Sequence, residues 1–297
     1  MILEGYNIIV TGGGGFIGSH LTDELLKKGN KVTVIDNFST GKIENWNQKA
    51  NLIVKDINDV RSCEIKNHDY VFHLAAIPRM MKSILNPIET NRANIDGTLN
   101  MLWASKKAKI KKFIYASSSS IYGDQKYLPI SEDAEKSPKS PYALQKYVGE
   151  EYCRLFNELY GFPTVSCRFF NVYGPRQDDQ SDYCCVIGKF LKFKREGKPA
   201  TIYGDGKQTR DFTYVNDIVN GLILAMEKGP SGMVFNLGAG KNVSVNEIAE
   251  IINAGDIEYV EARQGEPQDT LADITAANTI LGWKSKISIK KGIESCI

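Results

Sequence analysis

Tyr142 and Lys146 are the two residues whose types and spacing point most directly to chemistry, because they stand four positions apart at the start of a helical pattern. Ser140 followed by Pro141 is typical of a helix N-cap and the first helical position, so the helix should begin beside Tyr142. Side chains at positions i and i+4 share one face of a helix. The phenol and the ammonium should therefore project to the same side, one turn apart.

That arrangement suits a tyrosine that acts as a base. A free phenol has a pKa of about 10, and lowering it to about 7 requires about 4 kcal/mol of preference for the phenolate. One cation about 4 Å away in a partly buried site supplies about that much. An isolated pair with this spacing could equally lie on an exposed helix, with the tyrosine packed and the lysine solvated, so the rest of the chain must decide.

Composition narrows the class of protein. The chain has 297 residues, with 37 basic and 35 acidic side chains and a formal net charge of +2. This balance gives no electrostatic case for binding nucleic acid or an anionic membrane. The apolar runs are shorter than the ~20 residues of a membrane span, and the chain opens on a strand-like run instead of a signal peptide, so we expect a cytoplasmic protein. The six cysteines and three histidines show no metal-ligand spacing, and we expect no metal site.

A glycine-rich turn near the start of the chain predicts a dinucleotide site. It follows the apolar run Asn7–Thr11 and precedes a helical pattern, and the next strand, Lys31–Ile35, ends at Asp36. Two overlapping sets fit a dinucleotide fingerprint, namely Gly12, Gly15 and Gly18, or Gly13, Gly15 and Gly18. Glycines let the backbone approach a pyrophosphate, which then rests on the helix N-terminus. Asp36 can accept a hydrogen bond from a ribose 2′-hydroxyl and would repel a 2′-phosphate, which favours NAD over NADP.

Further apolar, β-branched segments follow at the spacing of alternating strands and helices. They are Asn51–Ile57, Tyr70–Ala76, Lys112–Ala116 and Thr164–Phe170. Such strands suit a parallel sheet buried on both faces, so we predict an α/β fold: a Rossmann-type doubly wound parallel sheet with a smaller C-terminal α+β substrate domain. We place the domains at residues 1–173 and 174–297, with about residues 213–240 folding back onto the first.

These features together resemble the extended short-chain dehydrogenase/reductase family, and within it the nucleotide-sugar 4-epimerases. The resemblance covers nearly the whole chain. Besides the glycine turn and the Tyr142–Lys146 pair, it rests on Asp36–Gly41, His73–Ala76, Asn94–Thr98, Ser117–Ser120, Arg168–Pro175, Arg210–Phe212 and Leu281–Trp283. It implies a UDP-sugar substrate, a NAD cofactor that stays tightly bound and is regenerated in every turnover, and a homodimer. The helix after Tyr142 could contribute to the dimer interface, although its apolar face could equally be core.

The resemblance also implies roles for single residues. The catalytic residues would be Ser118, Tyr142 and Lys146. The cofactor-binding residues would be Gly12, Gly15, Phe16, Ile17, Gly18, Asp36, Asn37, Asp56, Ile57, Ala75, Ala76, Asn94, Tyr142 and Lys146. The substrate-binding residues would be Ser118, Ser119, Tyr142, Asn171, Tyr203, Arg210, Arg263 and Thr270. The two arginines would clamp the substrate pyrophosphate, since the planar guanidinium suits phosphate oxygens.

Ser119 and Ser120 separate reactions within the family. Sugar dehydratases and decarboxylating members carry a carboxylate one or two residues after the position of Ser118, whereas this chain has serines there. A hydroxyl cannot act as a carboxylate base near neutral pH. The resemblance thus implies epimerisation: Tyr142 removes the proton of the sugar 4-hydroxyl, directly or through Ser118, while NAD takes the hydride from C4. Lys146 would hold the nicotinamide ribose, and the 4-keto sugar would turn and be reduced on its other face.

Thr270 bears on the choice of sugar. The resemblance places it where a large tyrosine restricts some epimerases to UDP-glucose and UDP-galactose, whereas a smaller residue leaves room for an N-acetyl group. We therefore predict UDP-GlcNAc and UDP-GalNAc as substrates, with UDP-Glc and UDP-Gal as further candidates. A UDP-glucuronate 4-epimerase is the alternative, although Asn171 stands where those enzymes carry threonine and no added cation is evident for the carboxylate. A net NAD-dependent oxidoreductase and a non-catalytic NAD-binding module also remain open.

Overall fold

The computed structural model describes residues 4–178, 185–261 and 268–297. Its largest element is a seven-stranded sheet with the order β11-β6-β5-β4-β1-β2-β3, in which all neighbouring strands are parallel. The strands are β1 (Asn7–Thr11), β2 (Lys31–Asp36), β3 (Asn51–Val54), β4 (Tyr70–His73), β5 (Lys112–Ser118), β6 (Thr164–Phe169) and β11 (Val234–Leu237). The strand order reverses beside β1, as in a doubly wound sheet, and the predicted α/β fold is confirmed.

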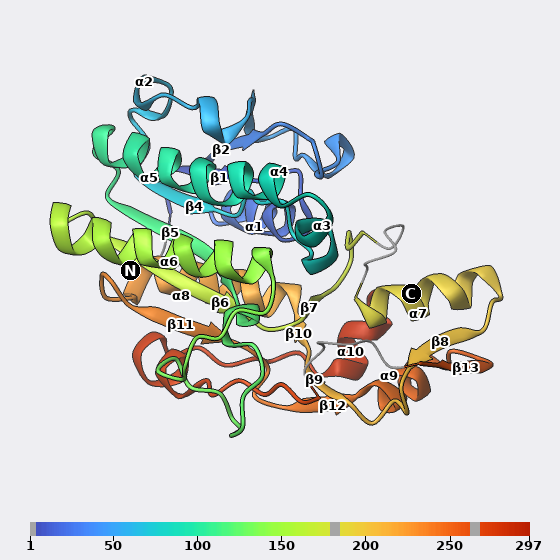
Figure 1. Cartoon of the computed structure of the whole chain (residues 1–297). Helices are drawn as coiled ribbons and strands as arrows, with labels where there is room; N and C mark the ends of the chain where they lie inside the picture. The colour runs from blue at the N-terminus through green and yellow to red at the C-terminus, as the bar shows by residue number, and fades with distance from the viewer. Residues whose placement is uncertain (1–3, 179–184, 262–267) are drawn as a thin grey trace.

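Helices cover both faces of this sheet (Figure 1). One face carries α5 (Gly97–Lys107) and α6 (Pro141–Tyr160), and the other carries α1 (Phe16–Lys27) and α8 (Val215–Lys228). Successive residues of a strand point to opposite faces. In β1, Ile8 and Val10 join the core under α1 and α8, whereas Ile9 joins the core under α5 and α6. Burial on both faces explains why these strands are nearly unbroken apolar runs.

Two predicted strands end earlier than expected. The strand predicted over Asn51–Ile57 ends at Val54, and the strand predicted over Tyr70–Ala76 ends at His73. After β3, the Asp56 carboxylate accepts a hydrogen bond from the backbone N–H of Asn58 at 2.9 Å and caps a 3₁₀ turn. This local bond competes with strand pairing, as Asp side chains commonly do.

Short helical segments connect the larger elements. They are α2 (Ser62–Ile65), α3 (Met80–Leu85), α4 (Pro87–Asn91), the 3₁₀ turns Ile43–Asn45, Ile57–Asp59 and Ser119–Tyr122, and the π-helical turns Arg92–Asp96 and Ala277–Leu281. The first of the π-helical turns joins α4 to α5. No helix in the described part of the chain combines the length and the apolar character needed to cross a membrane.

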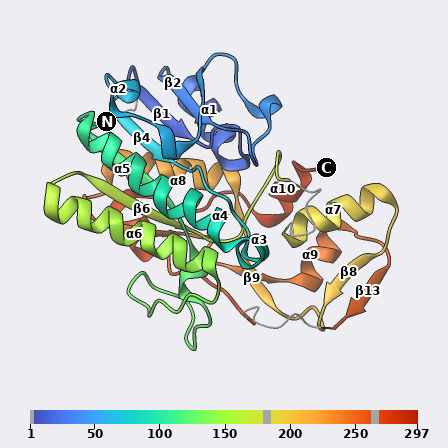
Figure 2. The same cartoon turned by 45° about the horizontal axis from the view of Figure 1, so that its top comes forward.

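The C-terminal part has a core of its own. Its elements are β7 (Val172–Tyr173), α7 (Val186–Glu196), β8 (Ala200–Tyr203), β9 (Thr209–Asp211), β10 (Thr213–Tyr214), β12 (Asn242–Ser244), α9 (Val245–Ile252), β13 (Ile257–Val260) and α10 (Ile289–Glu294). The small strands form three two-stranded sheets. Figure 2 shows α7, α9, β8 and β13 gathered at one end of the molecule, away from α5 and α6. Between these segments the chain returns to the large sheet, where β11 pairs with β6.

Candidate active site

The first turn of α6 brings Tyr142 to the end of β5. Ser140 is the N-cap of α6, its hydroxyl accepting from the backbone N–H of Ala143 at 3.2 Å, and Pro141 is the first helical residue, as the sequence predicts. Ser118 is the last residue of β5, and its hydroxyl forms a hydrogen bond with the phenol of Tyr142. The structure therefore brings two of the three predicted catalytic residues into direct contact.

Lys146 lies on the same helix but is directed elsewhere. It is 4% exposed, and its ammonium donates to the carbonyl oxygen of Ala116 at 2.8 Å and lies 5.0 Å from the ring centroid of Tyr115. Burial lowers the pKa of Lys146 to about 8, and the charge of Glu150 opposes that shift. A buried ammonium needs an acceptor, and the carbonyl at the end of β5 supplies one.

The predicted effect of Lys146 on the pKa of Tyr142 stays a prediction. Burial raises the pKa of Tyr142, and the influences that oppose it are the hydrogen bond with Ser118 and the charge of Arg79. The contact between Lys146 and Ala116 holds the ammonium at the backbone of β5.

Arg79 is a residue that the sequence analysis missed. It is the N-cap of α3, in the segment that follows the end of β4. Its side chain is half-buried, and its charge lowers the pKa of Tyr142 against the effect of burial. The available signal was its position: it lies in the connection after a sheet strand, on the edge where ligands of doubly wound sheets bind.

The glycine turn is shaped by close backbone approaches. Gly12 has a φ of +72°, and a Cβ added to it would lie 2.8 Å from the backbone nitrogen of Ala75. A Cβ on Gly18 would collide with the carbonyl oxygen of Gly12. Gly15 is the N-cap of α1, whose first turn has no capping side chain and no acidic residue. The backbone N–H groups of Phe16 and Ile17 therefore open a helix terminus suited to a pyrophosphate, so these residues fit a dinucleotide.

Asp36 closes the same site from β2. It is 8% exposed, and its carboxylate accepts from the backbone N–H groups of Gly14 and Phe38, both at 2.8 Å. These bonds fix the carboxylate beside the glycine turn. Next to it, the amide of Asn37 donates to Asp56 at 3.0 Å, and Asp56 also caps the turn that begins at Ile57. Burial raises the pKa of Asp56, but the hydrogen bonds from Asn58 and Asn37 outweigh it, so the pKa is lowered.

The side-chain amide of Asn94 connects two segments of the site through buried hydrogen bonds. Its amide accepts from the backbone N–H of Ile77 at 2.8 Å and donates to the carbonyl of Ile77 at 3.0 Å and to Gln145 at 2.8 Å. These bonds join the segment after Ala75 and Ala76 to helix α6 between Tyr142 and Lys146. The predicted cofactor residue thus holds two parts of the site together.

The residues predicted to bind the sugar come from distant segments. The amide of Asn171 donates to the hydroxyl of Thr270 at 3.5 Å and to the carbonyl oxygen of Asp211 at 3.3 Å. The carboxylate of Asp211 in turn accepts from backbone N–H groups, those of Ala239, Gly240 and Ala272. Burial raises the pKa of Asp211 to about 6, although these hydrogen bonds oppose the shift. The structure therefore brings Asn171 and Thr270 together.

The remaining predicted substrate residues are less closely grouped. Arg210, in β9, donates to the carbonyl oxygens of Thr209 at 2.9 Å and Gln268 at 3.1 Å. Tyr203 ends β8 and is half-buried, and Ser119 begins the 3₁₀ turn after β5. Arg263 lies outside the described residues.

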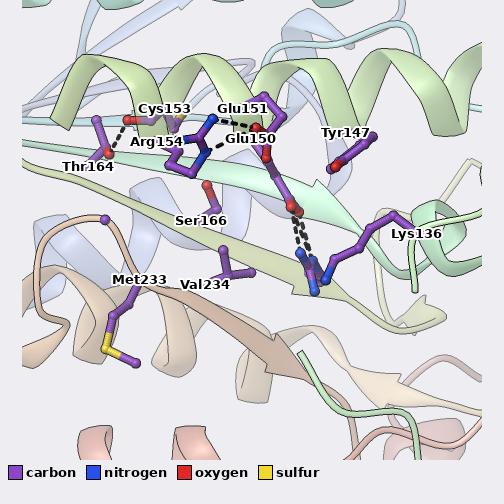
Figure 3. A pocket seen from close by; sticks show the side chains of 12 residues that line it. Lys136, Tyr147, Glu150, Glu151, Cys153, Arg154, Thr164, Ser166, Met233 and Val234 are labelled. Carbon is purple, nitrogen blue, oxygen red and sulfur yellow. Dashed lines mark hydrogen bonds and ion pairs between the residues drawn. The ribbon is translucent and has the colours of Figure 1, made fainter. Parts of the chain in front are cut away.

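A buried ion pair supports the other side of α6. The side chains of Glu150 and Arg168 are each 3% exposed, and the guanidinium Nη2 of Arg168 lies 2.8 Å from Oε2 of Glu150. The hydroxyl of Ser117 also donates to the Glu150 carboxylate. Figure 3 shows Glu150 pointing from α6 into a small pocket of about 80 Å³. In the same view, Glu151 and Arg154 form an ion pair that is 40% and 45% exposed. The buried pair ties α6 to β6, whereas the outer pair is solvated and contributes little.

Comparison with known proteins assigns the chain to a family. Residues 8–238 match the model of the NAD dependent epimerase/dehydratase family. The chain belongs to this family. Its cofactor is NAD, which the glycine turn, the open N-terminus of α1 and Asp36 fit.

Similar proteins cover nearly the whole chain. A putative UDP-glucose 4-epimerase of Methanocaldococcus jannaschii is 39% identical over 299 residues, covering 98% of this chain and 97% of that protein. The solved UDP-N-acetylglucosamine 4-epimerase of Methanobrevibacter ruminantium M1, in complex with UDP-N-acetylmuramic acid, is 39% identical with a TM-score of 0.94 and covers 98% of both chains. The UDP-glucuronic acid 4-epimerase of Bacillus cereus, in complex with UDP-glucuronic acid and NAD, is 36% identical with a TM-score of 0.88 over 97% of both chains. UDP-sugar decarboxylases match as well.

Proposed function

We propose that this protein interconverts UDP-GlcNAc and UDP-GalNAc by epimerisation at C4 of the sugar. At the coarser level, its relatives make it a NAD-dependent nucleotide-sugar 4-epimerase, which is an isomerase. The single observation that carries the finer proposal is the contact between Asn171 and Thr270 in the sugar side of the site. Threonine is small, and it leaves room there for an acetamido group.

The geometry around Tyr142 supplies the proton transfer. Its phenol and the hydroxyl of Ser118 form one hydrogen-bonded pair, so either can stand next to the sugar 4-hydroxyl while the proton passes to the phenolate. A NAD bound at the glycine turn would supply the hydride acceptor for C4 and the hydride donor on return, so that no net oxidation would occur. Lys146, held 2.8 Å from the carbonyl of Ala116, adds positive charge to the same site. On return, Tyr142 donates its proton to the oxygen of the 4-keto sugar.

The serines after β5 favour epimerisation over elimination or decarboxylation. Ser119 and Ser120 form the first part of the 3₁₀ turn after Ser118, and the backbone N–H of Ser120 donates to the hydroxyl of Ser118 at 3.2 Å. This bond holds Ser118 at the phenol. Because neither position offers a carboxylate, the site lacks there the additional base that those other reactions use.

A UDP-glucuronate 4-epimerase is the second candidate, and Arg79 is the observation that favours it. A sugar carboxylate would need a cation, and Arg79 acts electrostatically on Tyr142, where the sugar would lie. The similar Bacillus cereus enzyme acts on UDP-glucuronic acid. Asn171 and Thr270 together give the acetamido sugar the stronger case.

The test is a substrate comparison with the purified protein and no added NAD. UDP-GlcNAc, UDP-Glc and UDP-glucuronate are supplied in parallel, and the products and any CO₂ are measured. We expect UDP-GlcNAc to give the highest kcat/KM and no substrate to release CO₂. Turnover of UDP-glucuronate with complete inactivity on UDP-GlcNAc would replace the first candidate by the second.

We also propose that a second copy of the chain covers the outer face of α5 and α6. Trp103 is 43% exposed, Leu159 68% and Tyr160 47%, and these side chains line a groove of about 540 Å³ between the two helices. Exposure of large apolar side chains to water is unfavourable, and such patches are typical of protein–protein interfaces. Sedimentation should give a dimer for the natural chain and a monomer for Leu159→Glu. A monomeric natural chain at micromolar concentration would contradict this assembly.

A further inference from the structure

Asp211 is enclosed behind the residues predicted to bind the sugar. It is the last residue of β9 and is completely buried, whereas its neighbours Asn171 and Thr270 are half-buried. Asp211 therefore lies behind these two residues and does not reach the surface that a sugar could contact. A carboxylate hidden from water is costly unless hydrogen-bond donors surround it, so the partners of Asp211 indicate what it does.

The backbone of Asp211 bonds to both predicted sugar residues. Its N–H donates to the hydroxyl of Thr270 at 3.4 Å, and its carbonyl oxygen accepts from the amide of Asn171 at 3.3 Å. The amide of Asn171 also donates to the Thr270 hydroxyl at 3.5 Å. A displacement of Asp211 would therefore change the spacing between Asn171 and Thr270.

The carboxylate of Asp211 holds two further segments. One oxygen accepts from the backbone N–H of Ala239, and the other accepts from those of Gly240 and Ala272, both at 3.1 Å. Ala239 and Gly240 follow β11, whereas Ala272 lies two positions after Thr270. An ionised carboxylate has two oxygens and only accepts hydrogen bonds. It suits three N–H donors better than an amide, which has a single acceptor oxygen.

The packing around Ala272 is tight. A Cβ added to Gly238 would collide with the Cβ of Ala272 and lie 2.8 Å from the carboxylate of Asp211. On the other edge of the segment, Ile130 exchanges backbone hydrogen bonds of 2.8 Å and 2.9 Å with the residues on either side of Ala272. The chain that carries Thr270 is therefore fixed from both edges, by Asp211 and by Ile130.

We propose that Asp211 is a positioning residue for the sugar: its carboxylate holds the segment of Thr270, and its backbone sets the spacing of Thr270 and Asn171, which decides the sugar substituent that fits. Supporting hydrogen bonds of this kind fix the geometry of binding residues. The inference rests on the proposed function, because it deepens the choice among UDP-sugars. A purely structural role would affect all UDP-sugars equally, whereas a positioning role changes the preference among them.

A second buried aspartate provides a matched control. Asp217, in the first turn of α8, is 4% exposed. Its carboxylate accepts from the hydroxyl of Ser285 at 2.8 Å and from the backbone N–H groups of Lys286 and Ile287, both at 3.0 Å. None of these bonds involves a residue predicted to bind the sugar. Asp211→Asn and Asp217→Asn should both lower the free energy of unfolding, but only Asp211→Asn should alter the sugar preference.

The first measurement is the ratio of kcat/KM for UDP-GlcNAc to kcat/KM for UDP-Glc. We expect Asp211→Asn to lower this ratio about tenfold, because at least one backbone N–H then faces a donor and the segment of Thr270 shifts. NAD should stay bound, and Asp217→Asn should leave the ratio unchanged. An unchanged ratio in Asp211→Asn, with or without a loss of overall activity, would overturn the proposal.

Gly238→Ala tests the same segment without changing the carboxylate. Its added Cβ pushes on Ala272 beside Asp211, so the ratio should again fall. If Asp211→Asn does not fold, Gly238→Ala decides the question. A folded Gly238→Ala protein with an unchanged ratio would then contradict the proposal.

A double-variant cycle tests whether Asp211 acts through Thr270. Thr270→Val keeps the shape of the side chain and removes the hydroxyl that accepts from Asp211 and Asn171. We expect the combined variant to change the ratio by less than the product of the two single effects, because both act on one contact. Single effects that multiply without interaction would show that Asp211 does not act through Thr270.

Binding measurements separate this inference from the proposed function. Dissociation constants of UDP, UDP-GlcNAc, UDP-Glc and UDP-glucuronate are measured by calorimetry on the NAD-bound protein, which requires no turnover. If the natural chain binds UDP-glucuronate best, the proposed substrate is wrong, but Asp211→Asn should still weaken that sugar about tenfold more than it weakens UDP. Equal weakening of UDP and of every UDP-sugar would overturn the role of Asp211 and leave the proposed substrate standing.

Discussion

The predicted cofactor side and the predicted sugar side of the site are built in different ways. The glycine turn and Asp36 of the predicted cofactor side lie in the continuous stretch from β1 to β2, and backbone contacts set its shape: Gly12 packs against Ala75 in the segment after β4, and Gly18 packs against Gly12. The sugar side depends on side chains from segments far apart in the chain, since Asn171 and Thr270 are separated by 99 positions. The first kind of site tolerates almost no change of residue size, and the second can change its ligand by changing single side chains.

The proposed mechanism places Tyr142 between the two sides, so its substitution should have the largest effect. Tyr142→Phe keeps the ring and loses only the hydroxyl that bonds with Ser118. We expect kcat to fall about 10²–10⁴-fold, the usual contribution of general acid–base catalysis, with NAD still bound. Turnover and the ratio of bound nucleotide to protein are measured together. Tyr147→Phe on the same helix is the control and should remain active; comparable activity in both variants would show that Tyr142 is not the base.

Substitution of Gly12 tests the backbone-built side alone. Gly12→Ala adds a Cβ 2.8 Å from the nitrogen of Ala75 at a φ of +72°. We expect loss of bound NAD and a decrease in the free energy of unfolding of about 1–3 kcal/mol, the usual cost of overpacking. Gly161→Ala is matched, because its φ is +59° but no atom lies within 4 Å of an added Cβ. It should cost about 1 kcal/mol and keep NAD. Equal NAD retention in both would refute a backbone-built cofactor site.

Thr270→Tyr tests the side-chain-built side, with a smaller effect. The larger side chain should fill the space beside Asn171 and lower kcat/KM for UDP-GlcNAc about tenfold or more relative to UDP-Glc. NAD binding should not change, because no contact of the glycine turn is involved. Thr270→Ser retains the hydroxyl that accepts from Asn171 and serves as the control. A uniform loss on both sugars would indicate damage to the fold of the site instead of a change in specificity.

The difference between the two sides also explains what the sequence could predict. The glycine turn, the strands around it and the N-cap of α6 depend on neighbours in sequence, and their types and spacing indicated them. A local side-chain hydrogen bond could still make a prediction wrong. Asp56 caps the turn that follows β3, and the strand ends earlier than predicted. The direction of Lys146 depended on an acceptor 30 positions away, the carbonyl of Ala116, which no local pattern reveals.

Arg79 illustrates the limit more clearly. A positive φ can usually be predicted from a glycine in the sequence. Here an arginine adopts it, so the sequence did not indicate the turn before α3. Its segment contacts Tyr142 through the hydroxyl of Ser83 in α3, and this contact arises only when α3 packs on α6. The roles of the sugar-side residues stay predictions for the same reason: their meaning depends on contacts among distant segments, and Arg263 lies outside the described residues.

The central claim is that hydrogen leaves C4 of the sugar and returns to the same carbon. UDP-GlcNAc carrying deuterium at C4 is incubated in ordinary water with the purified protein and no added NAD, and the product is examined by mass spectrometry. The account predicts UDP-GalNAc that retains deuterium at C4, with no reduced cofactor released. Loss of the deuterium to solvent, or release of reduced cofactor in proportion to turnover, would contradict it.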